Sequence, residues 1–376
     1  MKAIQQKLNN KKEDNAKYYC AFSYLNFSPL FKAKLFEYFD YDIKRAFLSD
    51  KKDMGNFNDI YDISVPKEFF SKKAKLNPDE CLKSALSKEE IKILTYEDSK
   101  YPPLLREIPD FPLSLYYLGD LSNINYNHML AVVGSRRATN VAKGALNSII
   151  SGLNNTDITI VSGLAYGIDA TAHECALNNN LKTIAVIGSG LDFQYPVQNK
   201  KLYSDIVASG GIIFSEYHLG IKPYSSNFPQ RNRIVVGMCE GTLVAEAQIK
   251  SGAMISANLT LEYNRELMCI PGSILNPNTS GIYHLIKNGA GIVTTADDLL
   301  NNLGWDMIHN ESTKNNLDDL NNIQKEILDI ISYGEVSFDE IAQKSKADIS
   351  SLMVVLTELE LKGLIKQSNC KYYKNK

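Results

Sequence analysis

Arginine is scarce in this chain, and four of its seven arginines fall in two short stretches. Arg136 and Arg137 belong to the run GSRR, while Arg231 and Arg233 lie near the start of the stretch 228–257. The guanidinium group binds phosphate through paired hydrogen bonds and stacks on flat bases. Because lysine supplies most of the other positive charge, this clustering indicates phosphate binding. The alternative for each arginine is a structural ion pair with a carboxylate at the edge of a sheet.

Each stretch also contains a short apolar run that leads into small residues. The run 129–133 is followed at once by Gly134, and the run 242–245 is followed by Ser251 and Gly252 at the start of a helical pattern. A strand that feeds a helix through small residues presents free backbone N–H groups and the positive end of the helix dipole. Both stretches therefore predict an anion site.

Short apolar segments alternate with helical patterns from Met129 onward. The strand candidates are 129–133, 158–161, 183–187, 211–214, 242–245, 266–270 and 291–293. This alternation predicts an α/β fold, a Rossmann-like and mostly parallel sheet with helices on both faces. Ligands of such sheets bind outside the C-terminal ends of the strands. The candidate loops are therefore 134–137, 162–167, 188–192, 215–216, 245–252 and 271–273.

Motifs for common cofactors are absent from the sequence. Gly188-Ser189-Gly190 begins like a dinucleotide fingerprint, but Phe193 stands where the third glycine belongs, and no P-loop motif occurs. Metal-ligand spacing is missing too, so we expect no cofactor, no metal and no catalytic residue. Asp169 and His173 stand four residues apart on one helical face. They are either an acid–base or phosphate-contacting pair, or a helix cap and a locally bonded histidine.

Composition places the chain among reduced proteins of the cytoplasm. Its six cysteines form no C-x-x-C pair, residues 1–16 lack the apolar core of a secretory signal, and no apolar run reaches membrane-spanning length. We therefore expect a cytoplasmic location without membrane insertion. The formal net charge is −2, so a nucleic-acid site must be a local patch.

At 376 residues the chain should hold more than one domain. We expect residues 1–16 to be disordered, 17–100 to form a small helical domain, 101–302 the Rossmann-like domain, 303–320 a linker and 321–376 a winged-helix domain. The dense prolines after Tyr101 indicate an extended connector.

The winged-helix prediction rests on three helical patterns and a terminal hairpin at 364–373. Ser337 and Glu340 have the spacing of a capping box at the second helix. The third helix carries Glu358 and Glu360, with Lys362 only at its end. Base reading in the major groove uses basic and amide side chains. Docking of a partner and DNA reading therefore both stay open for this module.

Six motifs make the chain resemble the DprA/Smf family of bacterial DNA-processing proteins. They are AVVGSRRAT (131–139), VSGLAYGIDATAHECAL (161–177), IGSGLDFQYPVQN (187–199), FPQRNRIVVG (228–237), EAQIKSGAMISA (246–257) and PGSILNPNTSGIYHLIKNGA (271–290). They cover the whole expected α/β domain in order. Gln230 stands where the family has arginine, and Ser256 where it commonly has threonine.

The resemblance implies a homodimer that binds single-stranded DNA and helps load the RecA recombinase during natural transformation, without catalysis. The DNA-binding residues it implies, with two neighbours from the same loops, are Gly134, Ser135, Arg136, Arg137, Ser162, Gly163, Tyr166, Gly167, Arg231, Asn232, Arg233, Lys250, Ser251 and Gly252. Positive grooves with aromatic side chains bind single strands in this way. Tyr166 and Tyr195 either stack on bases or pack in the core.

An enzyme is the competing hypothesis. Nucleoside-monophosphate N-glycoside hydrolases of the lysine-decarboxylase-like class combine a Rossmann-type sheet with a G-T-x-x-E loop. The segment GTLVAE (241–246) is offset from that motif by one residue, and Met238-Cys239-Glu240 replaces the expected P-G-G. Glu246 would be the general base. A third hypothesis is a transcription regulator that uses the C-terminal module.

Overall fold

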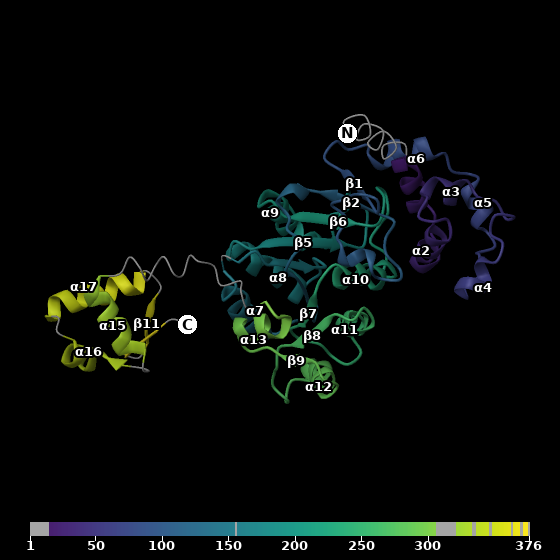
Figure 1. The fold of residues 1–376 in the computed structure, drawn as a ribbon. Helices are drawn as coiled ribbons and strands as arrows, with labels where there is room; N and C mark the ends of the chain where they lie inside the picture. Colours follow the sequence, from purple (N-terminus) through teal and green to yellow (C-terminus); the bar gives the residue numbers. More distant parts are fainter. Residues whose placement is uncertain are drawn as a thin grey trace. The chain divides into compact units, whose positions relative to one another are not determined.

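The computed structural model describes residues 15–154, 156–305, 321–332, 336–345, 348–361, 364–368 and 371–374. The chain divides into two compact units, Met1–Ile308 and His309–Lys376, and each is described by itself (Figure 1). The expectations for residues 1–14 of the N-terminal segment and for most of the linker, residues 306–320, lie outside the described residues. The domain boundaries at residues 100 and 302 stay predictions.

A nine-stranded sheet forms the centre of the first unit, counted over its described residues. The strands are β1 (Lys92–Thr95), β2 (Ser114–Leu118), β3 (Met129–Val133), β4 (Thr159–Ser162), β5 (Lys182–Ile187), β6 (Ile212–Ser215), β7 (Gly241–Val244), β8 (Glu266–Cys269) and β9 (Gly291–Ile292). Their order is β1-β2-β6-β5-β4-β3-β7-β8-β9, and the pairs β1–β2 and β2–β6 are antiparallel while the other pairs are parallel. The predicted α/β fold is confirmed.

Helices cover both faces of the sheet (Figure 1). They are α7 (Asn140–Ser151), α8 (Ile168–Asn178), α9 (Lys200–Ala208), α10 (Asn227–Gly237), α11 (Gly252–Glu262), α12 (Ser280–Lys287) and α13 (Ala296–Leu303). Side chains alternate between the faces of a strand. Leu130 and Val132 accordingly join the core under α7, α8 and α13, whereas Met129, Ala131 and Val133 join the core that contains α10 and α11.

The helices that precede the sheet share its larger core. Residues 15–23 are helical, and α2 (Pro29–Tyr38), α3 (Ile43–Leu48), α4 (Phe57–Tyr61), α5 (Phe69–Lys73) and α6 (Pro78–Ala85) follow. Phe31 packs edge-to-face against Phe57 and Phe69. These aromatic residues belong to the same cluster of buried residues as the sheet. The aromatic-rich spacing of this segment reflects that packing.

The order of the strands reverses between β3 and β7. The chain runs outward from β3 through β4, β5 and β6, then returns to place β7 on the other side of β3. In open parallel sheets the crossover helices leave a crevice at such a point, at the C-terminal ends of the strands. The loops that follow β3 and β7 therefore face a common space.

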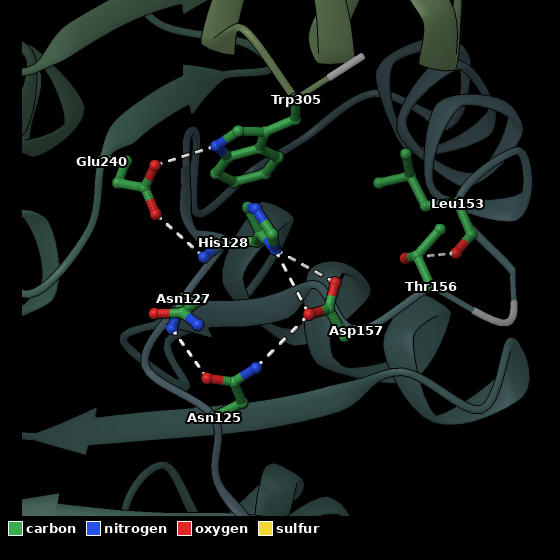
Figure 2. Close-up of polar contacts among 8 residues, drawn as sticks. All are labelled: Asn125, Asn127, His128, Leu153, Thr156, Asp157, Glu240 and Trp305. Carbon is green, nitrogen blue, oxygen red and sulfur yellow. Dashed lines mark hydrogen bonds and ion pairs between the residues drawn. The ribbon is translucent and has the colours of Figure 1, made fainter. Parts of the chain in front are cut away.

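A polar network lies at the N-terminal ends of the central strands, opposite the groove end of the sheet (Figure 2). The Glu240 carboxylate accepts hydrogen bonds from the backbone N–H of His128 and from the indole N–H of Trp305, each at 2.8 Å. The His128 ring lies 3.1 Å from Asp157 and edge-on to the indole, with 5.1 Å between ring centroids. The network joins the residues before β3, β4 and β7 to the end of the first unit's last described helix.

The second unit is a winged helix within its described residues. It contains α15 (Asn322–Ser332), α16 (Phe338–Lys344) and α17 (Ile349–Leu361), with the sheet β10-β12-β11 formed by Val336–Ser337, Lys371–Lys374 and Ile365–Ser368. Ser337 and Glu340 form the predicted capping box. The predicted hairpin is the antiparallel pair β11–β12.

Candidate nucleic-acid interface

A groove of about 820 Å³ lies where the loops after β3 and β7 meet α10 and α11. Arg136, Arg137 and Arg231 are the cationic residues among those that line it, and Asp169 is the single carboxylate. Neutral donors complete the lining: Ser135, Ser225, Asn232, Gln248, Ser251, Ser256 and Asn278. The groove thus combines guanidinium, amide and hydroxyl groups, which are ligands for phosphate.

The loop after β3 is fixed through its backbone and leaves its arginines exposed. The backbone N–H of Ser135 donates to the carbonyl of Glu246 at 2.7 Å, and that of Arg137 donates to the Ser135 hydroxyl at 3.1 Å. The Arg136 guanidinium lies 5.1 Å from the ring centroid of Phe228. That position over an aromatic face favours a cation, so Arg136 is held at the rim of the groove.

Arg231 reaches the groove from α10 but is 4% exposed. Its nearest acid is Asp169, whose Oδ2 lies 3.9 Å from Arg231 Nη1. This separation is too long for a hydrogen bond, and Arg231 Nε is buried without a partner. Burial lowers the pKa of Arg231, Asp169 opposes that shift, and Arg136 adds to it. The structure therefore presents a buried guanidinium whose donors are not used by the described residues.

Arg233 lies on a different side of α10 and does not line the groove. Its Nη2 donates to both oxygens of Glu216, at 2.7 and 2.6 Å, and its Nε lies 3.5 Å from Asp110. It is 2% exposed. The ion-pair alternative fits Arg233, because its guanidinium is flanked by the carboxylates of Glu216 and Asp110 and lies outside the groove lining.

Some of the other predicted residues line the groove, and others lie outside its lining. Asn232, Ser251 and Gly252 line the groove. The Ser251 hydroxyl, at the N-cap of α11, makes no capping bond and has no hydrogen-bond partner within the described part of the chain. Lys250 is exposed but outside the lining, while Ser162 is buried and donates to the carbonyl of Val132 at 2.7 Å.

Three glycines let the loops approach each other closely. A Cβ atom on Gly134 would lie 2.5 Å from the Ile168 side chain, and one on Gly167 would lie 2.2 Å from the carbonyl oxygen of Ser135. Gly167 also has a φ of +75°, a conformation that favours glycine. Gly163 faces Arg231 in the same way. These residues shape the groove rather than supply ligands.

A smaller hollow of about 40 Å³ adjoins the groove and has aromatic walls. Tyr166, Tyr195 and Phe228 line it together with Arg136 and Arg231. The rings of Tyr195 and Phe228 stack, with centroids 5.7 Å apart. Tyr166 and Tyr195 are 37% and 41% exposed, and the Tyr166 hydroxyl bonds to Gln198. Their exposure favours the stacking interpretation over core packing.

Asp169 and His173 do not form a pair with each other in the structure. The His173 ring is fully buried and its Nδ1 lies 2.7 Å from the Thr183 hydroxyl. Burial lowers the pKa of His173 to about 3. It is therefore neutral near pH 7 and locally bonded. Asp169 stands at the start of α8, accepts from the backbone N–H of Ala165 at 3.4 Å and faces Arg231.

Glu246, the general base of the hydrolase hypothesis, is 1% exposed and fully engaged. Its carboxylate accepts from the Thr139 backbone N–H at 3.1 Å, the Thr139 hydroxyl at 2.8 Å and the Asn276 amide at 3.1 Å. A buried carboxylate with three donors is poorly placed to take a proton from a substrate. Glu246 instead ties together the loops after β3, β7 and β8, a role that the sequence did not reveal.

The described residues contain no cluster of three or more His, Cys, Asp or Glu side chains with the geometry of a metal site. Among the same residues, no helix has the length and apolar character needed to cross a membrane.

Two protein-family models match this chain. The family model of DNA recombination-mediator protein A matches residues 92–304, and the DprA winged-helix model matches residues 311–369. The chain belongs to the DprA/Smf family. The first match spans the sheet and the groove, and the second covers the described winged helix except its last strand, β12.

Individual DprA/Smf proteins support this assignment. DprA of Streptococcus pneumoniae is 44% identical over 217 residues, which are 57% of this chain and 76% of that protein. Protein Smf of Escherichia coli is 35% identical, over 70% of this chain and 72% of its own length.

Two solved structures of DprA proteins also match. The X-ray structure of S. pneumoniae DprA superposes with a TM-score of 0.62 at 36% identity and covers 72% of this chain and 95% of its own. The Helicobacter pylori protein, described for its single-stranded DNA binding mode, has a TM-score of 0.52 at 31% identity over 57% of this chain and 97% of its own.

Proposed function

We propose that this protein binds single-stranded DNA in the groove and helps load the RecA recombinase onto it during natural transformation, without catalysis and as a homodimer. The observation that carries the proposal is the buried Arg231 guanidinium, which has no hydrogen-bond partner among the described residues and faces a groove rimmed by Arg136 and Arg137. Burial of a charge is costly unless a partner compensates it. A DNA phosphate is a partner of the right chemistry.

The groove supplies both parts that a single strand needs. Phosphates would bind the arginines and the first turn of α11, where Ser251 and Gly252 open the helix. Bases would stack on the aromatic wall formed by Tyr195 and Phe228. None of these contacts reads a base edge in a duplex groove, so the strand would be bound without sequence preference.

Kinship supports the remaining parts of the proposal. The matching family model is one of DNA recombination mediators, and the H. pylori relative is described for binding single-stranded DNA. Transfer of the strand to RecA and association of two copies are inferred from this kinship. The structural role of Glu246 favours a binding protein over the hydrolase.

Fluorescence anisotropy with labelled oligonucleotides of unrelated sequence tests the proposal. We expect binding to single strands that is stronger than to duplexes, indifferent to sequence and weakened by salt. The rate of RecA filament assembly on the same strands, with and without the protein, tests the loading step. Equal affinity for duplexes, or release of free base from nucleoside monophosphates, would contradict the proposal.

A further inference from the structure

Asp169 is an acidic residue in the lining of a groove that is proposed to bind anions. Among the residues that line the groove it is the single carboxylate, beside three arginines. It is 8% exposed and stands in the first turn of α8. A carboxylate close to a bound phosphate repels it, so Asp169 opposes the binding that the arginines favour.

The contact between Asp169 and Arg231 is a loose one. The shortest distance between the two side chains is 3.9 Å, whereas Arg233 binds Glu216 at 2.6 Å. Asp169 thus compensates the charge of Arg231 without occupying its hydrogen-bond donors. Either the buried carboxylate or a bound phosphate can therefore supply the main negative charge that compensates this guanidinium.

We propose that Asp169 competes with DNA phosphate for Arg231, so that its negative charge weakens the hold of the groove on single-stranded DNA and its protonation strengthens that hold. The proposal rests on the proposed function and names a residue that sets the strength of binding. A mediator that transfers its strand to a recombinase needs a hold that can be released.

Several groups near Asp169 and Arg231 affect the pKa of Asp169. Burial raises the pKa of Asp169, while Arg231, the backbone N–H of Ala165, Arg136 and the backbone N–H of Gly163 oppose that rise. A phosphate on Arg231 would raise the pKa of Asp169 further, because it adds a second negative charge.

The other titratable groups near Arg231 stay neutral over the relevant range. Burial lowers the pKa of His173 to about 3, and burial raises the pKa of Tyr217. Because burial raises the pKa of Asp169, its carboxyl gains a proton at a higher pH than an exposed aspartate does, and DNA affinity is then expected to rise.

The test compares the wild-type chain with Asp169→Asn at constant salt, between about pH 7.5 and 5.5. Asparagine keeps the size and an acceptor oxygen but removes the charge. We expect Asp169→Asn to bind a labelled oligothymidine about tenfold more tightly at the upper pH. The difference should shrink as the pH falls toward the pKa of Asp169, because the wild-type carboxyl then loses its charge. Glu174→Gln, an exposed change on the same helix, is the matched control and should leave affinity unchanged.

A second measurement does not need the variant to fold. Calorimetric titration of the wild-type chain in buffers of different ionisation enthalpy reports protons taken up on binding. We expect net proton uptake when the wild-type chain binds the strand. Binding by wild type without proton uptake and with a flat pH profile would overturn the role of Asp169 and leave the groove assignment intact. No binding of single strands by wild type would instead overturn the proposed function.

Discussion

The guanidinium of Arg231 lies against the backbone of Gly163, in the space that any other side chain would fill. A Cβ atom placed on Gly163 would lie 1.3 Å from Arg231 Nη1. The loop after β4 therefore accepts Arg231 only because residue 163 lacks a side chain. Position 163 thus controls where the buried charge of the groove points.

We expect Gly163→Ala to displace Arg231 and to lower affinity for single-stranded DNA by tenfold or more, about 1.4 kcal/mol. Gly144→Ala, on α7 and outside the groove lining, is the matched control for folding effects, since a Cβ atom there would meet no atom within 4 Å. Anisotropy measures affinity and thermal unfolding measures stability. Unchanged DNA affinity in a folded Gly163→Ala protein would contradict the placement of phosphate at Arg231.

Replacing Arg136 and Arg137 by alanine should weaken binding and flatten its salt dependence. Each lost phosphate contact on a single strand reduces the slope of log affinity against log salt by about 0.7. Both side chains are exposed, so stability should change little. Arg45→Ala, an exposed arginine of α3, is the control. A slope that is the same in the double variant and in wild type would remove these arginines from the interface.

Replacing Glu246 by alanine should destabilise the first unit. The change leaves the Thr139 and Asn276 donors without their acceptor, at a cost of about 2–4 kcal/mol in the free energy of unfolding. Urea unfolding measures this cost. The hydrolase hypothesis predicts a different result, namely base release by wild type that Glu246→Ala loses while its stability is kept.

At the N-terminal ends of the central strands, Glu240→Ala should also lower stability. It removes the acceptor of the Trp305 indole and of the His128 backbone N–H, which costs about 2–3 kcal/mol. The chain has one tryptophan, so its fluorescence reports on this edge directly. Glu262→Ala, an exposed change on α11, is the control. Equal urea midpoints for the two variants would show that the network contributes little.

Deletion of residues 320–376 should leave affinity for single-stranded DNA within tenfold, about 1.4 kcal/mol. The groove is lined by residues of the first unit, and the second is a compact unit with its own core. Anisotropy with the shortened chain measures the effect. A larger loss would mean that the winged helix contributes to the strand's binding site.

The sheet was predictable because its strands are short apolar runs between turn-forming residues. All seven predicted strands lie within one residue of the observed ones at each end. β1 and β2 were missed, because β1 lies at the end of the segment predicted to be helical and β2 follows a proline-rich stretch predicted to be an extended connector. The antiparallel pairing of β2 with β6 depends on tertiary packing that no local pattern records.

The different environments of Arg231 and Arg233 were not predictable from their spacing alone. Two residues apart on a helix, they point about 200° away from each other. Arg231 therefore faces the groove, while Arg233 faces Glu216 and Asp110. Asp110 belongs to the connector before β2, far from α10 in sequence, so only the folded chain brings the pair together.

The three-way attachment of Glu246 has a consequence for protein engineering. Because one carboxylate holds Thr139 and Asn276 at once, the rims of the groove behave as a single rigid frame. A loop grafted from another member of the family would keep its conformation only if Thr139, Glu246 and Asn276 were matched by the same three residues. Chimeras that exchange one rim alone should lose their geometry even when every arginine is retained.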